Sequence, residues 1–297
     1  MRPYFIVNPI AGSGESLKKF EQLKAYLDSR GAEYGCIMTE KPSQSTELAE
    51  RAYSSGERYI VAVGGDGTVN EVASALYTKD DVIMGMCPFG TGNDFARVLK
   101  LPSEPEEIGR ILLEGAPARV DIGMAGGKPF TNVGGMGFDV DVVINTEKYK
   151  ARFNGMLPYL LGIVKSMLHL NKVPVRVIAD GNVYEDRILI LSIGNGSHIG
   201  GGMAALPQAD ARDGLFDVCM VKAVSFFSFI TLLPGFIKGK HVGKKPVRYF
   251  RAKEVTIECD RTPMQLDGEL GEYAPTTFRL IPGALNMMLP ISDGAEG

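Results

Sequence analysis

The chain has little cysteine and no long apolar run, and both absences limit what it can be. Its 297 residues include four cysteines without C-x-x-C spacing, each in or beside an apolar strand-like run. A buried free thiol is the usual outcome there, so we expect a reducing compartment and no zinc. No apolar run reaches the roughly 18 to 20 residues of a membrane span, and the start of the chain leaves no room for a signal peptide. We therefore expect a cytoplasmic protein. The cysteines are Cys36, Cys87, Cys219 and Cys259.

Two common nucleotide-binding motifs are also missing. Gly65-Asp66-Gly67 lacks the third glycine of G-x-G-x-x-G because Asn70 occupies that position, and no G-x-x-x-x-G-K-[ST] occurs. These absences disfavour a Rossmann oxidoreductase and a P-loop ATPase. The three histidines have no ligand spacing, and we assign them no chemistry.

The most informative feature present is a glycine-rich turn, Gly64-Gly65-Asp66-Gly67-Thr68-Val69-Asn70-Glu71, between an apolar run at residues 59–63 and a helix-compatible stretch. Such a corner directs backbone N–H groups and the positive end of a helix dipole at one point, which suits an anion. Asp66 would repel a bare phosphate, so its presence indicates a bridging Mg²⁺ or a proton-transfer role. The alternative is an ordinary βα loop.

Two further glycine-rich loops follow apolar runs. They are residues 8–14, after a short strand at Tyr4–Val7, and residues 88–95, after the run 82–87. In the second loop Asn93 or Asp94 is available to cap the next helix. Because ligands bind at the carboxyl ends of strands in an open parallel sheet, the three corners predict one crevice.

The hydrophobic pattern changes midway and predicts two domains, at residues 1–125 and 126–290. The first half alternates strands with helix-period segments, which indicates a parallel sheet. The second half is strand-rich, and Asp180-Gly181-Asn182 is typical of a hairpin. Residues 291–297 form a tail that can return to the first domain. The expected helices are 16–29, 43–54, 68–77, 104–114, 140–166 and 226–237, and the expected later strands are 173–179, 183–194, 215–221, 247–250, 255–259 and 276–281.

The three corners resemble the catalytic domain of diacylglycerol kinases, whose relatives are bacterial lipid kinases and sphingosine kinases. The resemblance continues through Gly194-Asn195-Gly196, Gly200-Gly201-Gly202, residues 207–217 and Leu266-Asp267-Gly268-Glu269, and so covers nearly the whole chain. The G-G-D-G turn alone is shared with NAD kinases and resembles that of phosphofructokinases. The resemblance implies an open, mainly parallel α/β N-terminal domain like theirs, followed by a mainly antiparallel β-sandwich.

The resemblance also implies an ATP- and Mg²⁺-dependent lipid kinase, with diacylglycerol as the leading acceptor and phosphatidic acid as the product. Phosphoryl transfer needs positioned phosphates, a divalent metal and a base. By resemblance, Glu269 is the general base, Asp66 organises the metal and phosphates, and Asp267 orients Glu269 or shares in metal binding. From the residues alone, Asp267-Gly268 is equally an exposed turn. The ATP contacts carried over are Asn8, Pro9, Ile10, Ala11, Gly12, Thr39, Gly65, Asp66, Gly67, Thr68, Val69, Asn70, Glu71 and Thr91.

A second metal site is implied by the segment at residues 210–215, which resembles the structural Mg²⁺ site of the family. Asp213 would contribute its carboxylate, while Asp210 and Leu215 would offer backbone carbonyls. Oxygen ligands of this kind suit a hard cation. The alternative is a surface turn with two solvated aspartates.

A membrane-facing segment is indicated by charge. Residues 218–253 contain no Asp or Glu and eight Lys or Arg, although the whole chain has a net charge of −3. The basic patch indicates an anionic partner. Within it, the apolar stretch Phe226–Ile237 is too short to span a bilayer, and with the lysines up to Lys245 it has the composition of a helix lying on anionic lipid. The alternative is a core helix.

We therefore expect a protein peripherally associated with the inner face of the membrane, and the habit of the family suggests a homodimer. Nucleic acid is disfavoured because the aromatic residues form one apolar block and are not interleaved with basic ones. One alternative is a kinase for a soluble acceptor such as NAD, which would need a polar pocket in place of Phe226–Ile237. Another is a non-catalytic, nucleotide-responsive membrane-binding protein, which would not need both Asp66 and Glu269.

Overall fold

The computed structural model describes residues 1–150, 152–153 and 157–291. Internal contacts divide the chain into two compact units. The first unit comprises Met1–Asp121 and the segment that starts at Gly283, and the second unit comprises Ile122–Pro282. The predicted second domain continues to residue 290, whereas the chain re-enters the first unit at Gly283. From residue 292 onward, the predicted tail lies outside the described residues.

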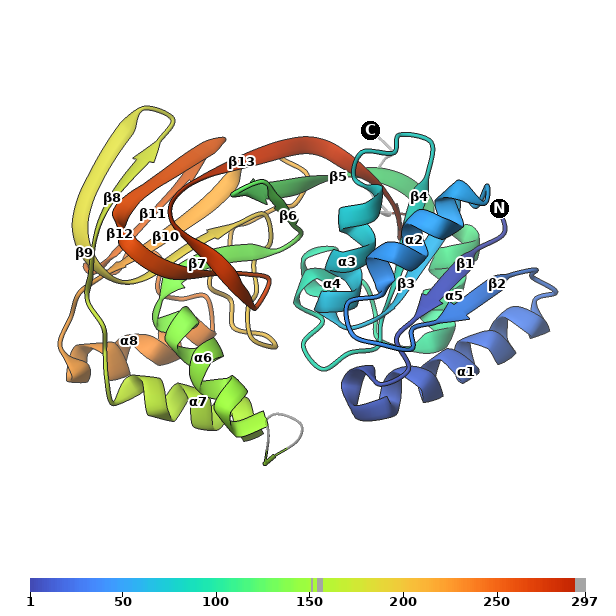
Figure 1. Cartoon of the computed structure of the whole chain (residues 1–297), viewed down its shortest axis with the longest axis horizontal. Coiled ribbons are helices and arrows are strands. Elements are labelled where there is room, and N and C mark those ends of the chain that lie inside the picture. The colour runs from blue at the N-terminus through green and yellow to red at the C-terminus, as the bar shows by residue number, and fades with distance from the viewer. Residues whose placement is uncertain (151, 154–156, 292–297) are drawn as a thin grey trace. The chain divides into compact units, whose positions relative to one another are not determined.

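A parallel sheet forms the centre of the first unit (Figure 1), with the strand order β4-β3-β1-β2. The C-terminal part of the long strand β13 (Glu269–Leu289) runs beside β4, with Met287 opposite Met84. This return of the chain explains why the first unit includes residues beyond Gly283. The other strands are β1 (Tyr4–Val7), β2 (Gly35–Met38), β3 (Tyr59–Gly64) and β4 (Ile83–Pro88).

Helices cover this sheet because its strands are apolar on both faces. Alternate residues of a strand point to opposite faces, and in β3 the residues Ile60, Val61 and Ala62 are all fully buried. Helices α1 (Glu15–Ser29) and α5 (Pro105–Glu114) pack on the face to which Val61 belongs. The remaining helices of this unit are α2 (Ser45–Ser54), α3 (Asp66–Leu76) and the short α4 (Asp94–Val98).

The second unit is built from antiparallel strands in the order β11-β10-β9-β7-β12-β13, and β8 pairs with both β9 and β12. The Asp180-Gly181 turn joins β8 to β9 as predicted, with Ala179 opposite Asn182. The strands are β5 (Ala116–Ala125), which enters from the first unit, β6 (Lys128–Phe130), β7 (Val133–Gly137), β8 (Val173–Ala179), β9 (Asn182–Gly194), β10 (Phe216–Lys222), β11 (Val247–Ala252) and β12 (Glu254–Leu266).

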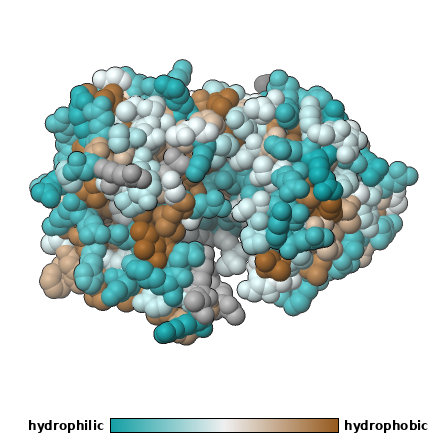
Figure 2. Space-filling view, viewed as in Figure 1, coloured by the Kyte–Doolittle hydropathy of each residue, from teal (hydrophilic) through white to brown (hydrophobic). Residues whose placement is uncertain are grey.

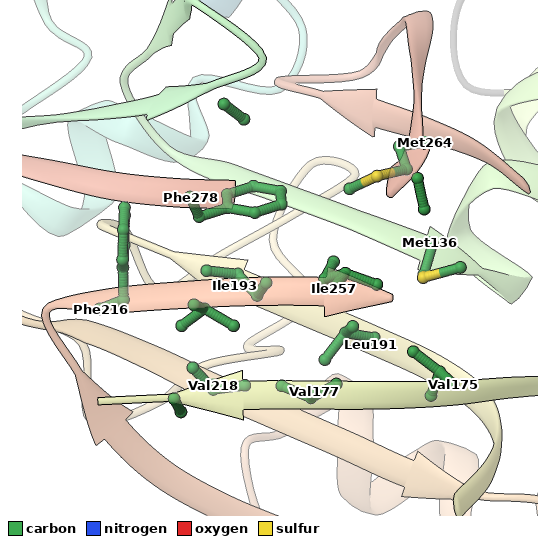
Figure 3. Packing of buried hydrophobic residues seen from close by; sticks show 14 of the residues in the cluster. Met136, Val175, Val177, Leu191, Ile193, Phe216, Val218, Ile257, Met264 and Phe278 are labelled. Atoms are coloured by element: carbon green, nitrogen blue, oxygen red, sulfur yellow. The ribbon is translucent and has the colours of Figure 1, made fainter. Parts of the chain in front are cut away.

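A layered core holds the second unit together, as Figure 3 shows. Phe216 of β10 and Phe278 of β13 meet edge to face with ring centroids 6.4 Å apart, and Phe130 stacks on Phe216. Burial of each such ring stabilises the fold by roughly 1.5 to 3 kcal/mol. Together with the first unit, this confirms the predicted architecture of a mainly parallel α/β part followed by a mainly antiparallel β-sandwich.

Three helices cover a second core cluster of this unit: α6 (Phe138–Lys150), α7 (Leu157–Met167) and α8 (Phe226–Ile237). Phe138 of α6 contacts Phe229 of α8, with ring centroids 4.8 Å apart. Ser225 caps the N-terminus of α8, because its hydroxyl accepts a hydrogen bond from the Ser228 N–H at 3.3 Å. Among the described residues, no helix is long and apolar enough to cross a bilayer.

Several sequence predictions need correction. The single helix expected over residues 140–166 is wrong, because α6 and α7 are separate. The strand expected at residues 276–281 is only part of β13, and strands β5, β6 and β7 were not foreseen. The predicted burial fails for Cys36, which is exposed because it lies on the edge strand β2. Within the described residues all four cysteines are free thiols.

Candidate functional site

The three glycine-rich corners meet in the first unit. A Cβ atom on Gly90 would overlap the Cα of Gly65, and one on Gly12 would lie 2.9 Å from the Phe89 carbonyl oxygen. Gly12 also has a φ of +59°, in the left-handed region that glycine adopts without strain. Only glycine therefore lets the loops after β1, β3 and β4 approach this closely.

Hydrogen bonds join the same loops. The Asn8 side-chain amide donates to the Thr68 hydroxyl at 3.1 Å, and the Asn8 backbone N–H donates to the Val63 carbonyl at 2.9 Å. The Thr39 N–H donates to the Val7 carbonyl at 2.8 Å, which brings the end of β2 to the same edge of the sheet. The corners therefore form one connected rim.

A pocket of about 350 Å³ opens at this rim. The first turn of α3 borders it, and the N–H groups of that turn have no partner within the helix because the first intrahelical bond is donated by Val69. Unpaired N–H groups at a helix N-terminus bind anions. The lining residues are Asn8, Ile10, Ala11, Thr39, Glu40, Lys41, Pro42, Ser43, Gly65, Gly67, Thr68 and Glu71.

Most of the residues predicted to contact the nucleotide line this pocket, and the others lie elsewhere. Gly12 and Asp66 lie at the contacts between the corners and do not line the pocket. Val69 is a core residue with 1% exposure, and Thr91 is exposed but does not line the pocket. Pro9 and Asn70 do not line the pocket either. Residues 40–43 were missed, although they follow β2 at its carboxyl end, where the sheet topology places ligands.

Asp66 holds a neighbouring loop. Its Oδ1 accepts a hydrogen bond from the Phe95 N–H at 3.1 Å and so caps α4 from another corner. Burial raises the pKa of Asp66, and the backbone N–H groups at the start of α4 oppose that rise. The expected cap by Asn93 or Asp94 is wrong, because Asp94 is the first residue of α4 and the Asn93 side chain closes its own turn through two hydrogen bonds with the Gly90 backbone.

Glu71 acts in the same way on another helix. Its Oε2 accepts a hydrogen bond from the Ser45 N–H at 2.9 Å, at the first residue of α2. The Thr46 hydroxyl donates to the Glu71 carbonyl at 3.1 Å. Both carboxylates of the glycine-rich turn therefore fix adjacent helices and leave the N-terminus of α3 as the anion-binding feature of the pocket.

In the second unit, Asp267 anchors a tight hairpin. Asp267 and Gly268 have φ angles of +50° and +85° and connect β12 to β13 in a two-residue turn. The Asp267 carboxylate accepts four hydrogen bonds, from the Thr131 N–H and hydroxyl and from the Asn132 and Val133 N–H groups, at 2.7 to 3.0 Å. Burial raises its pKa to about 6, and these donors oppose the rise. All of these partners lie in the second unit.

Glu269 follows this turn as the first residue of β13. Its side chain is exposed, and within the described residues it makes no hydrogen bond. The backbone pairs Glu269 with Leu266 across the hairpin. The structure therefore brings an anchored carboxylate, Asp267, and a solvent-facing one, Glu269, to one turn, which suits a positioned base.

Two residues that the sequence did not single out support this turn. The Gln265 side-chain oxygen accepts a hydrogen bond from the Gly268 N–H at 2.7 Å, and its amide donates to Asp139 Oδ2 at 3.2 Å. Asp139 lies in the first turn of α6, and burial raises its pKa to about 6. Its Oδ1 is buried and has no hydrogen-bond partner among the described residues. No local sequence signal identifies this pair, because they meet only through the sheet.

At the predicted second metal site, the two aspartate carboxylates take part in hydrogen bonds and ion pairs. Asp213 Oδ1 accepts from the Leu215 N–H at 3.0 Å, and its Oδ2 lies 3.4 Å from Arg251. The Asp210 carboxylate accepts from the Arg212 N–H at 3.1 Å. Arg251 also pairs with the buried Asp217. In the part of the chain that is described, no three His, Cys, Asp or Glu residues gather to hold a metal. The predicted ligand set, which is the Asp213 carboxylate with the backbone carbonyls of Asp210 and Leu215, stays a prediction.

Comparisons with known proteins agree with this architecture. The "Diacylglycerol kinase catalytic domain" family matches residues 2–125, and the "YegS C-terminal NAD kinase beta sandwich-like domain" family matches residues 132–289. Among curated proteins, a diacylglycerol kinase of Mycobacterium tuberculosis (strain CDC 1551 / Oshkosh) is 29% identical, over 96% of this chain and 94% of the relative. A diacylglycerol kinase of Bacillus subtilis (strain 168) is 27% identical, over 97% and 96%.

Solved structures show the same fold. A diacylglycerol kinase from Bacillus anthracis str. Sterne has a TM-score of 0.75 at 23% identity, over 97% of this chain and 96% of that one. Another solved chain from the same organism has a TM-score of 0.81 at 26% identity, over 97% of both chains. The similarity thus extends across both units.

Proposed function

Because this chain belongs to the diacylglycerol kinase catalytic-domain family and is a kinase acting on a lipid, we propose that it phosphorylates diacylglycerol to phosphatidic acid with ATP. The observation that carries this proposal is the pocket in the first unit, where three glycine corners meet at the N-terminus of α3. Closely approaching glycines and unpaired N–H groups suit a nucleotide phosphate chain. The volume of the pocket is within the range of small-molecule sites.

In this proposal the first unit holds the phosphates. The N–H groups at the start of α3 stabilise their negative charge, and Lys41 in the wall adds a positive charge. Asn8 and Thr68 are held to each other by their hydrogen bond and so keep the corners in register. Positioning of this kind supplies most of the rate in phosphoryl transfer.

A magnesium ion bound with ATP would offset the charge that develops on the transferred group. Asp66, the first residue of α3, would offer the carboxylate for such an ion, while backbone N–H groups at the start of α4 hold that carboxylate in place. The segment with Asp213 is not part of this proposal, because Arg251 and the Leu215 N–H occupy that carboxylate.

Glu269 is the proposed base. It takes the proton of the lipid hydroxyl as that oxygen bonds to the γ-phosphorus and the bond to the leaving ADP breaks. Its solvent-facing side chain can meet a substrate hydroxyl, and the four hydrogen bonds to Asp267 hold the turn that carries it. The acceptor is reached from an anionic membrane surface through residues 226–245.

Transfer of label from γ-labelled ATP into the organic phase tests the proposal, with mixed micelles of diacylglycerol, another hydroxyl lipid or no lipid. We expect labelled phosphatidic acid, lost by about two orders of magnitude or more in E269Q. The matched control E107Q removes an exposed carboxylate from α5 and should keep full activity. Wild-type turnover by E269Q would exclude this base, and label in another lipid would change the substrate but not the chemistry.

A further inference from the structure

Helix α8 carries apolar residues on two sides. Phe229, Leu232 and Phe236 are at most 5% exposed and pack in the core cluster of the second unit. Four others form what we call the α8 strip and are exposed, with Phe227 at 79%. The helix therefore both packs on the sheet and presents an uncovered apolar surface. The strip consists of Phe226, Phe227, Ile230 and Ile237.

Helix α7 adds a second uncovered strip. Leu157, Leu160, Val164 and Leu168 follow the three- and four-residue spacing of one helix face and are 46 to 64% exposed. Ile163 and Met167 of α7 pack against the same core cluster as α8. Figure 2 shows brown and tan atoms at the lower left, where Figure 1 places α7 and α8. Gathered apolar residues of this kind mark an interaction surface.

A cavity of about 500 Å³ lies on another side of α8. Three lysines, Lys222, Lys244 and Lys245, line it together with the hydroxyl-bearing Ser228 and Thr231 of the helix. A Cβ atom on Gly235 would lie 3.1 Å from the Lys244 ammonium, so this charge rests against the helix itself. Lysine ammonium groups suit a phosphate, whereas the Thr231 hydroxyl donates to the Ser228 carbonyl and the Ser228 hydroxyl bonds to that of Ser225.

The charge of this cavity is largely uncompensated. Lys222 pairs with Asp186 at 2.5 Å. Lys244 and Lys245 have no ion-pair partner among the residues that the structure covers, and residues 218–253 contain no carboxylate side chain. Two ammonium groups therefore remain available to an anion next to the apolar strip.

We infer that this cavity holds the phosphate of an anionic phospholipid headgroup while the α8 strip enters the apolar layer of the same membrane. A soluble phosphate would explain the lysines but not the exposed phenylalanines, whereas an anionic membrane explains both. The inference rests on the proposed function, for which it identifies the surface that meets the lipid.

Vesicle sedimentation of the full chain tests this inference, with phosphatidylcholine vesicles that contain or lack phosphatidylglycerol. We expect the wild-type chain to bind the anionic vesicles. K244Q/K245Q should weaken this binding about thirtyfold, because each lysine near the membrane surface contributes ~1 kcal/mol. The matched control K238Q/K240Q removes the same charge from lysines that do not line the cavity, and should weaken binding about threefold. Circular dichroism checks that each variant is folded.

The entry of the α8 strip into the apolar layer of the membrane is tested separately. F227S removes the most exposed side chain of the strip and should weaken binding to the same vesicles by about tenfold or more. V183S removes an exposed apolar side chain from the β8–β9 hairpin and should leave binding unchanged. Equal effects of the two lysine pairs, or wild-type binding by F227S, would overturn the inference.

An activity measurement keeps this inference separate from the proposed function. With a short-chain diacylglycerol dispersed in solution, K244Q/K245Q should turn over at the wild-type rate, because its defect is in docking. A wild-type protein that binds vesicles through these lysines but transfers no phosphate would refute the kinase reaction and leave the lipid surface intact. Lost turnover on the dispersed substrate in K244Q/K245Q would contradict a docking role.

Discussion

The Oδ1 atom of Asp66 accepts a hydrogen bond from the backbone N–H of Phe95 at 3.1 Å, although the two residues belong to different helices, α3 and α4. The residue expected to organise metal and phosphates therefore also caps α4. These two roles can be separated by substitution, because asparagine caps a helix about as well as aspartate but carries no charge.

We predict that D66N keeps the free energy of unfolding within about 0.5 kcal/mol and loses turnover by about two orders of magnitude. D66A should lose turnover and also about 1 kcal/mol of stability, because the cap disappears. Urea unfolding and label transfer measure the two effects. Full activity in D66N would show that Asp66 acts only as a cap.

The contact between the Gly90 and Gly65 backbones predicts a steric effect. G90A should lower the unfolding free energy by about 2 kcal/mol or more and weaken ATP binding, because its Cβ would push the corners apart. G67A is the control, since a Cβ there meets nothing within 4 Å, and it should stabilise α3 by roughly 0.5 to 1 kcal/mol. Denaturant unfolding and ATP titration report both changes. Equal stability of the two variants would contradict this packing.

The four hydrogen bonds to Asp267 predict a large truncation effect. D267A leaves buried donors on Thr131, Asn132 and Val133 unpaired and should cost about 2 to 4 kcal/mol. D260A removes an exposed aspartate from the same strand and should stay within about 0.5 kcal/mol. Thermal unfolding that does not distinguish these variants would refute the anchoring role.

The buried Asp139 predicts a pH dependence of stability. Its pKa is raised to about 6, so the folded protein binds this proton more tightly than the unfolded chain does. The stability that it contributes is present at low pH, falls as the pH rises from about 4 to 6 and is lost above that range. D139N does not titrate, so its stability relative to wild type should rise over this range by up to about 3 kcal/mol. Urea unfolding at several pH values tests the slope, and a pH-independent difference would contradict it.

Much of the first unit was predictable because its helices, strands and turns follow from patterns among neighbouring residues. Strand β1 has the predicted bounds, and α1 and α5 begin one residue from theirs. Helix α8 of the second unit also has its predicted bounds. Periodicity and glycine placement act over a few neighbouring residues, so they can be read directly. The prediction that the three corners converge needed only the rule that parallel strands end at one edge of a sheet.

The failures concern contacts between distant segments. Nothing near Asp66 indicates that it caps a helix starting at residue 94, and nothing near Gln265 indicates that it meets Asp139. The length of β13 was underestimated because Pro275 and Pro282 interrupt its apolar pattern, although both lie within the strand. Nothing near Asp213 indicates that it pairs with Arg251, which is distant in sequence but an ion-pair partner in the fold.

The sequence by itself determined the chemistry available to this protein: glycine corners for an anion, carboxylates at Asp66 and Glu269, and lysines after an apolar helix. Tertiary structure alone decided which of these groups are engaged elsewhere. It assigned Asp267 and Glu71 to holding loops, left Glu269 exposed, and placed Lys222, Lys244 and Lys245 around one cavity. The reason is physical: composition and spacing fix the groups a chain carries, whereas hydrogen bonding and burial between distant segments determine the groups that remain available.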